Sequence, residues 1–244
     1  MRLRLDLAYL GTRFEGWQAQ EGTRPARTVQ GEVEAALGKL YGSKLRIHGA
    51  GRTDSGVHAN GQVAHFDTPE NGPAIPAHGL SRGLNAALPE DVRVTGVVEA
   101  APDWHARFAA TGKIYRYRLR RGEWLHPHLG QVEALAGEHL DVPSMRDAAA
   151  RLVGRRDFAR FALTGSDPGT TVRTLSRLSI DEEGSLLVIT AVGEGFLRGM
   201  VRRLVGTLRD VGRGHVRSAD ALERPGRTAL ARGLTLERVL YGSE

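Results

Sequence analysis

The sequence contains no cysteine, which excludes a disulfide framework, a thiolate nucleophile and a cysteine zinc site. It also lacks any apolar run near the roughly 20 residues that a membrane-spanning helix needs. The first six residues, Met1-Arg2-Leu3-Arg4-Leu5-Asp6, alternate in charge where a signal peptide would have an apolar core. We therefore expect a cytoplasmic protein without a membrane partner, in which any metal would need histidines and carboxylates as ligands.

Lysine is scarce in this chain, whereas arginine is abundant. Only Lys39, Lys44 and Lys113 are lysines among 34 basic residues, so the positive charge is almost all guanidinium, which binds phosphate bidentately and stacks on bases. The net charge of +6 is uneven, because residues 1–105 hold 11 Lys or Arg against 12 Asp or Glu, and residues 106–244 hold 23 against 16. A general bias toward arginine explains the lysine scarcity equally well, but it explains the asymmetry less readily. We expect the second half to face a polyanion.

Residues 1–105 have the pattern of an α+β domain with the order β-α-β-β-α-β. Leu3, Leu5, Leu7 and Tyr9 alternate with polar residues, which predicts a strand with one buried face. After a loop over residues 11–27, Thr28 is suited to cap a helix. The other expected elements are strands at 45–47 and 62–66, a helix at 77–88 and a strand at 92–98.

Residues 106–244 repeat much of this order. Tyr115, Tyr117 and Leu119 alternate with arginines and predict a strand, and Asp141 begins a helix. The other expected elements are strands at 175–180 and 186–192 around a turn at 181–184, a helix at about 199–211, and a helix with a strand-like tail at 230–241. The tandem order predicts two domains, 1–105 and 106–244, each a ferredoxin-like antiparallel sheet with helices on one face.

The segment from Gly49 to Gly61 is the strongest candidate site. It places Arg52, Asp54 and His58 among four glycines, between two strand-like runs. Glycines allow a backbone to approach a ligand closely. A structural alternative is a glycine-rich turn in which the Asp54 side chain caps backbone N–H groups, and composition alone favours that alternative.

Six blocks of the sequence, in order, resemble those of TruA-type tRNA pseudouridine synthases. The blocks are Gly11-Thr12-Arg13-Phe14-Glu15-Gly16-Trp17-Gln18, Gly51-Arg52-Thr53-Asp54-Ser55-Gly56-Val57-His58-Ala59, Gly83-Leu84-Asn85-Ala86-Ala87-Leu88-Pro89, His105-Ala106-Arg107-Phe108, Lys113-Ile114-Tyr115-Arg116-Tyr117 and Phe196-Leu197-Arg198-Gly199-Met200-Val201-Arg202. Together they span most of the chain, so the resemblance is far more specific than any single block.

The resemblance implies an enzyme that converts uridine to pseudouridine at positions 38, 39 and 40 of the tRNA anticodon arm. It implies a homodimer, in which the sheets of the two domains of one chain flank a basic RNA-binding cleft, and it implies Asp54 as the nucleophile. The reaction breaks the N1–C1′ bond, turns the uracil and rejoins it through C5, so no cofactor is required. A carboxylate serves as nucleophile if a nearby cation keeps it charged where solvent is excluded. Attack on the sugar and attack on the base both remain open.

Three further residues match functional positions of the family. Arg202 would pair with Asp54, Tyr115 would stack on the target uracil, and Arg52 would help to displace the base. Without the resemblance, Tyr115 fits a core residue equally well and Arg52 a surface arginine bound to phosphate. A helical projection also places Arg198, Arg202, Arg209 and Arg213 beside an apolar stripe, where a solvated face is an equal alternative for all but Arg202.

His58 and His65 suggest a metal pair, but no carboxylate-rich pattern accompanies them and the family uses no catalytic metal, so we interpret them as structural. The chain departs from the family at Leu10, Leu230 and Thr235, which affects loop conformation and tRNA contacts rather than the reaction class. Two rival functions are a noncatalytic RNA-binding protein and another RNA enzyme such as a methyltransferase. For the second rival we find no supporting motif, because the sequence has no strand-to-helix glycine-rich cofactor motif of the dinucleotide type.

Overall fold

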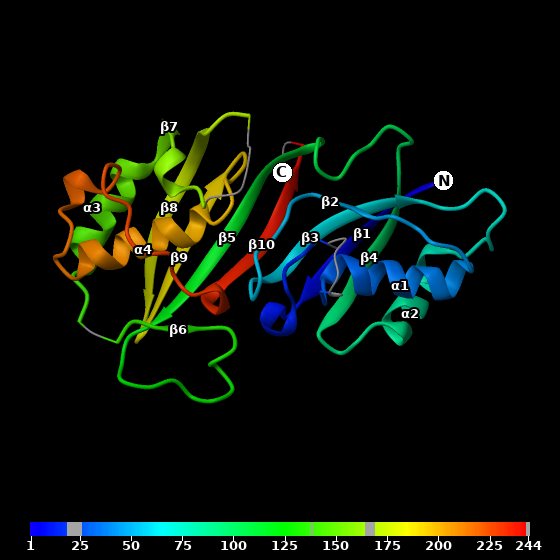
Figure 1. Cartoon of the computed structure of the whole chain (residues 1–244), viewed down its shortest axis with the longest axis horizontal. Coiled ribbons are helices and arrows are strands. Elements are labelled where there is room, and N and C mark those ends of the chain that lie inside the picture. The colour runs from blue at the N-terminus through cyan, green and yellow to red at the C-terminus, as the bar shows by residue number, and fades with distance from the viewer. Residues whose placement is uncertain (19–25, 138, 164–168, 243–244) are drawn as a thin grey trace. The chain divides into compact units, whose positions relative to one another are not determined.

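The computed structural model describes residues 1–18, 26–137, 139–163 and 169–242, so part of the loop expected at 11–27 lies outside the described residues. The chain forms two compact units (Figure 1). The first comprises Met1–Thr111 and Leu236–Glu244, and the second comprises Gly112–Thr235. Both units combine β-strands with α-helices, which confirms a mixed α and β fold.

The first unit is built on an antiparallel sheet. Its helices and strands are β1 (Arg2–Tyr9), η1 (Gly11–Arg13), α1 (Val29–Tyr41), β2 (His48–Gly49), β3 (His58–Asp67), α2 (Ala77–Ala87), β4 (Val92–Ala100) and most of β10 (Leu234–Tyr241). Along the sheet the strands follow the order β4-β1-β3-β10, and the short β2 also pairs with β3. Strand β1 runs antiparallel to both β3 and β4, so it lies inside the sheet.

The signals that predicted β1 and α1 act as expected. In β1 buried and half-buried residues alternate, with Leu5 and Leu7 completely buried. The side chain of Thr28 accepts a hydrogen bond from the Gly31 N–H and caps α1, and the helix ends at Gly42 with a φ of 68°.

The strand predicted at 45–47 is wrong, because the side chains of α1 bind the backbone that a strand would use. The N–H of Ile47 donates to Glu34 Oε1 at 3.0 Å, and its carbonyl accepts from Gln30 Nε2 at 3.1 Å. Strand pairing begins only at His48, which lies opposite His65 of β3.

The second unit contains four main strands. Its elements are β5 (Ala110–Arg120), β6 (Ala134–Leu135), α3 (Val142–Leu152), β7 (Gly154–Asp157), η2 (Ala159–Phe161), β8 (Val172–Glu183), β9 (Leu186–Gly193), α4 (Met200–Gly212), η3 (Ser218–Asp220) and η4 (Ala231–Gly233). The strand order is β5-β9-β8-β7, with antiparallel neighbours, and β6 pairs parallel to β5. Helix α3 packs on α4 and on β8, and its cap Asp141 accepts from the Ser144 N–H as predicted.

Two boundaries of the second unit differ from the sequence prediction. The turn expected at 181–184 is shorter, because Glu183 still pairs with Leu186 and only Gly184 and Ser185 connect the strands. Gly184 has a φ of 61°, which such a two-residue loop requires. Helix α4 begins at Met200 after Gly199 with a φ of 70°, so Arg198 precedes the helix and is not part of the arginine row that the helical projection placed beside its apolar stripe.

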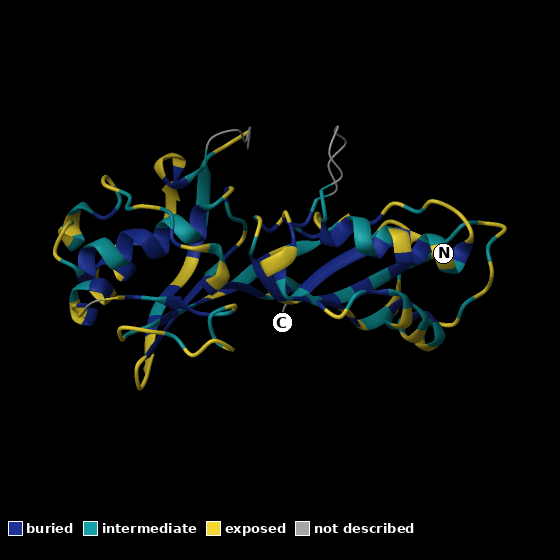
Figure 2. Ribbon diagram, turned by 60° about the horizontal axis from the view of Figure 1, so that its bottom comes forward, coloured by how far each residue is buried: buried dark blue, intermediate teal, exposed yellow. Residues whose placement is uncertain are grey.

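Burial follows the elements rather than the loops. Figure 2 shows buried residues along the strands and the inner sides of the helices, and exposed residues mainly in the connections. Across the described ranges, no helix is both long enough and apolar enough to cross a bilayer.

Candidate active site

The Asp54 loop, residues 50–57, connects β2 to β3 and is held by the segment 11–18. The N–H of Trp17 donates to the Thr53 carbonyl at 3.1 Å, and the N–H of Gly56 donates to the Phe14 carbonyl at 3.3 Å. The hydroxyls of Tyr9 and Thr53 are 2.8 Å apart. Burial raises the pKa of Tyr9 to about 12, so its hydroxyl stays protonated at neutral pH. The first two family blocks therefore form one structure.

Two glycines of the segment 11–18 allow this close approach. A Cβ atom on Gly11 would lie 2.0 Å from the Val57 carbonyl oxygen. A Cβ on Gly16 would lie 2.8 Å from the Thr53 carbonyl oxygen, and Gly16 also has a φ of 101°. Any side chain at either position would push the Asp54 loop away from the segment that supports it.

Asp54 itself is half-buried, and Arg52 is exposed, both in the first unit. The main-chain carbonyl of Asp54 closes a turn by accepting from the Val57 N–H at 3.1 Å. Backbone hydrogen bonds therefore hold this turn. The bonds at Thr53 and Gly56 also hold the loop on both sides of Asp54, which carries the carboxylate.

His58 and His65 each accept a backbone hydrogen bond in the first unit. Nδ1 of His58 accepts from the Gly11 N–H at 2.9 Å, and Nδ1 of His65 accepts from the Ala106 N–H at 3.2 Å. Both side chains are at most 3% exposed. The described residues contain no group of histidines and carboxylates arranged to hold a metal ion. These contacts support the structural interpretation of both histidines.

Tyr115 and Arg202 belong to the second unit. Tyr115 is 7% exposed, and its ring packs edge-on against Phe196, with centroids 5.2 Å apart and planes at 84°. The sequence places Phe196 in one of the family blocks but indicates no role for it. The available signal was its position just before a helix, since such loops carry residues toward a site. Phe196 therefore packs against the Tyr115 ring and restricts its rotation.

Arg202 is oriented by the segment that follows η3. Its Nε donates to the Ala229 carbonyl at 2.8 Å, while the Ala229 N–H donates to the Arg202 carbonyl at 3.0 Å. One helical turn later, a Cβ on Gly206 would lie 1.6 Å from the Arg227 carbonyl oxygen. Glycine at 206 thus lets this segment lie against α4 and contact Arg202.

The other arginines near α4 differ from one another. Arg209 and Arg213 each donate from Nη2 to the Ala136 carbonyl, at 3.2 and 3.1 Å. They are half-buried, whereas Arg198 is exposed. The alternative of a fully solvated charged face is therefore wrong for Arg209 and Arg213, which anchor the chain just after β6.

Tyr117 is a buried residue to which the sequence gave no role beyond the buried side of a strand. It is 0% exposed, and its hydroxyl has no hydrogen-bond partner among the described residues. Burial raises the pKa of Tyr117 to about 12, and the nearby cations Arg209, Arg202 and Arg232 partly oppose this shift. A Cβ on Gly233 would lie 2.6 Å from the tyrosine ring, so the contact needs glycine there.

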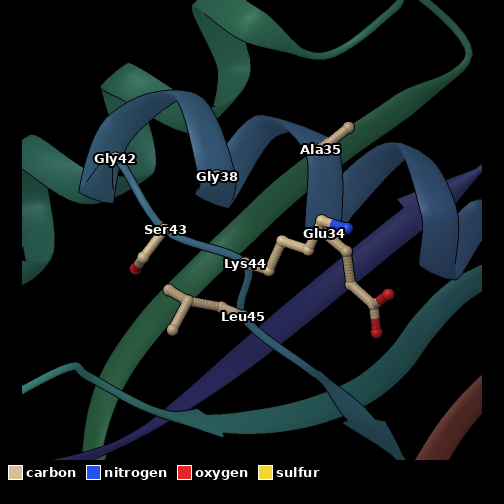
Figure 3. Close-up of a pocket in the computed structure, with 7 residues that line it drawn as sticks. All are labelled: Glu34, Ala35, Gly38, Gly42, Ser43, Lys44 and Leu45. Carbon is tan, nitrogen blue, oxygen red and sulfur yellow. The ribbon is translucent and has the colours of Figure 1, made fainter.

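A shallow pocket lies beside the end of α1, and none of the predicted site residues lines it (Figure 3). It is lined by Glu34, Ala35, Gly38, Gly42, Ser43, Lys44 and Leu45. Its only carboxylate, that of Glu34, already accepts from Gln30 Nε2 at 2.8 Å and from the Ile47 N–H. The pocket therefore belongs to the α1–β2 connection and offers no unengaged acid for catalysis.

Comparisons with known proteins identify the family. A family model described as tRNA pseudouridine synthase matches residues 7–109 and 148–241. The tRNA pseudouridine synthase A of Solidesulfovibrio magneticus is 46% identical over 99% of this chain and 92% of its own length. Those of Geobacter sulfurreducens and Geobacillus kaustophilus are each 40% identical, over 98% and 100% of this chain and 99% and 95% of their own lengths.

The chain therefore belongs to the tRNA pseudouridine synthase A family. Pseudouridine synthases are isomerases, so the expectation of an enzyme is confirmed, and the rival of a noncatalytic RNA-binding protein is not supported. A chain in the crystal structure of a Cbf5-Nop10-Gar1 complex shows a weak structural likeness, with a TM-score of 0.40 at 12% identity over 96% of this chain and 48% of that one. The family assignment depends on the sequence relationships alone.

Proposed function

We propose that this protein isomerises uridine to pseudouridine at positions 38, 39 and 40 in the tRNA anticodon arm, with Asp54 as the nucleophile. The observation that carries the proposal is the support of the Asp54 loop by the segment 11–18, within a chain of this family. A catalytic carboxylate must be held in one position relative to its substrate, and a loop supported by two glycine contacts meets that need.

The roles of the other site residues follow from their chemistry. Arg202 would keep Asp54 ionised in the closed complex with RNA, because a nearby cation favours the charged form of a carboxylate. Tyr115 would stack on the uracil, which its edge-on packing against Phe196 prepares. Arg52, exposed on the Asp54 loop, would help to displace the base from its stack. The enzyme would then need both halves of the chain for one reaction.

The proposal also covers the domain fold, the RNA-binding surface, the oligomeric state, the location of the enzyme and its cofactor need. Each half would be a ferredoxin-like domain, and the adjacent antiparallel strands β4, β1 and β3, with α1 and α2 in the same unit, support this. A basic cleft would bind RNA, which the arginine excess of residues 106–244 supports. The enzyme would work as a cytoplasmic homodimer without a cofactor. The family resemblance supports the dimer, and the balance of the reaction supports the absence of a cofactor.

Tritium release from tRNA labelled at C5 of uridine tests the reaction. We expect release from tRNAs with a single uridine at position 38, 39 or 40, and none when these positions lack uridine. Asp54→Asn should abolish release while tRNA affinity stays within about tenfold, because affinity depends mainly on phosphate contacts. Asp181→Asn, at an exposed carboxylate, is the control and should retain activity. Turnover by Asp54→Asn would refute the nucleophile, and release elsewhere in tRNA would refute the positions.

A further inference from the structure

The segment between β4 and β5, residues 101–109, carries the block His105-Ala106-Arg107-Phe108, to which the proposed reaction gives no role. This segment is green in Figure 1. Phe108 is 78% exposed, whereas Phe14, Phe66, Phe158 and Phe161 are at most 2% exposed. A single exposed apolar side chain is common at a protein surface, so the case for a binding role depends on what holds this ring in place and what lies beside it.

The segment is fixed by three hydrogen bonds from distant residues of the first unit. Arg2 Nη1 donates to the Trp104 carbonyl at 2.9 Å, and the Tyr241 hydroxyl donates to the Ala106 carbonyl at 2.7 Å. The Ala106 N–H donates to Nδ1 of His65. Both polar groups of the Ala106 peptide segment are therefore anchored, and the next two residues, Arg107 and Phe108, project from a rigid support.

Imidazole rings support Phe108 on one side. The His105 ring lies 4.3 Å from the Phe108 ring, and the His65 ring lies 4.5 Å from the His105 ring. His48 stacks on His65 at 5.2 Å. Burial is the first cause that lowers the pKa values of His65 and His105, which favours the uncharged form of both rings. Phe108 thus lies at the end of a group of packed flat rings.

Arg107 supplies the charge beside this ring. Its guanidinium carbon lies 5.9 Å from the Phe108 ring centroid, and in the described part of the chain no carboxylate lies within 4 Å of its nitrogens. The neighbouring cation Arg2, in contrast, is paired with Asp67 at 2.8 Å. An exposed ring beside an unneutralised guanidinium matches a nucleotide, whose base stacks and whose phosphate accepts hydrogen bonds.

We propose that Arg107 and Phe108 form a nucleotide-binding contact for the tRNA substrate, separate from the residues around Asp54. Phe108 stacks on an unpaired base, and Arg107 binds an adjacent phosphate. The contact deepens the proposed function and depends on tRNA being the substrate. It holds the RNA without taking part in bond making or breaking, so its loss weakens binding and leaves the chemical step intact.

The test measures tRNA affinity at several salt concentrations and the single-turnover rate at saturating tRNA. Phe108→Ala should weaken binding roughly 5- to 100-fold, the range for loss of one base–aromatic stack, and Phe108→Trp should restore it. Arg107→Ala should lower the magnitude of the salt slope by about one, which Arg107→Lys should largely restore. The single-turnover rates of these variants at saturating tRNA should stay within about twofold of the wild-type rate. Trp124→Ala, at another exposed aromatic residue, is the matched control and should bind normally.

Unchanged affinity of Phe108→Ala would overturn the proposal. A lower melting temperature or a changed oligomeric state in that variant would also overturn it, since the ring would then serve packing or contact with a second copy. These outcomes are separate from failure of the proposed reaction. A wild-type protein that binds tRNA but releases no tritium would refute the reaction, while the affinity measurements would still decide the role of Phe108.

Discussion

The main-chain N–H of Gly11 donates to Nδ1 of His58 at 2.9 Å. This bond joins the first residue of η1, two positions after the end of β1, to the first residue of β3, and the Asp54 loop leads directly into that strand. Because Gly11 also lies against the Val57 carbonyl, the position of the proposed nucleophile depends on a residue 43 positions earlier in the sequence.

Gly11→Ala should therefore damage both stability and activity. The new Cβ would lie 2.0 Å from the Val57 carbonyl oxygen, and overpacking of this kind costs about 1–3 kcal/mol. Urea unfolding should show that loss, and the single-turnover rate should fall. Gly79→Ala is the control, because its Cβ would meet no atom closer than 3.8 Å within α2 and alanine favours a helix. Equal behaviour of the two variants would contradict the close-approach role.

Phe196→Ala should reduce activity through Tyr115. The edge-on contact between the two rings contributes about 0.5–1.5 kcal/mol beyond simple burial, and without it the Tyr115 ring would be less well oriented for its proposed stacking on the uracil. We expect the single-turnover rate to fall about tenfold, in line with that range, and Phe196→Tyr to retain most of it. Wild-type rates for Phe196→Ala would show that Tyr115 needs no such support.

Tyr117→Phe should be neutral or stabilising by up to about 1 kcal/mol, because it removes a buried hydroxyl that has no hydrogen-bond partner in the described chain. Tyr9→Phe is the matched comparison. It removes a hydroxyl bonded to Thr53 and should cost about 1 kcal/mol. Denaturant unfolding of both variants gives the comparison. A larger loss for Tyr117→Phe would mean that its hydroxyl has a function among the neighbouring arginines.

Acid should destabilise the first unit through His65. Burial, followed by the charges of His105, Arg2 and His48, lowers the pKa of His65 to about 4, against the opposing effect of Asp67. The unfolded chain therefore binds the proton first. The stability that neutral His65 provides is complete above about pH 6.5 and is lost as the pH falls toward 4.

The measurement compares the free energy of unfolding at pH 7 and pH 4.5 for wild type and His65→Gln. The glutamine amide oxygen can still accept the Ala106 N–H but does not titrate in this range. Between these pH values the wild type should lose about 2 kcal/mol more than the variant, given about 1.4 kcal/mol per pKa unit. Equal losses would show that His65 titrates normally.

Local patterns determined much of the fold. Alternation in β1, the Thr28 cap of α1 and the Asp141 cap of α3 were readable from the sequence and are confirmed, because each depends on residues close together in the chain. The family was readable too, from ordered blocks. The roles of Asp54, Arg52, Tyr115 and Arg202 stay predictions.

Contacts between distant segments decided the rest. The strand expected at 45–47 fails because Gln30 and Glu34 bind the backbone of Ile47. Tyr115 and Tyr117 show the same limit, since alternation assigns both to one face of β5. One ring meets Phe196, and the other lies near Arg202 and Arg209. Periodicity fixes the direction of a side chain, whereas only the packing of remote segments fixes what that side chain contacts.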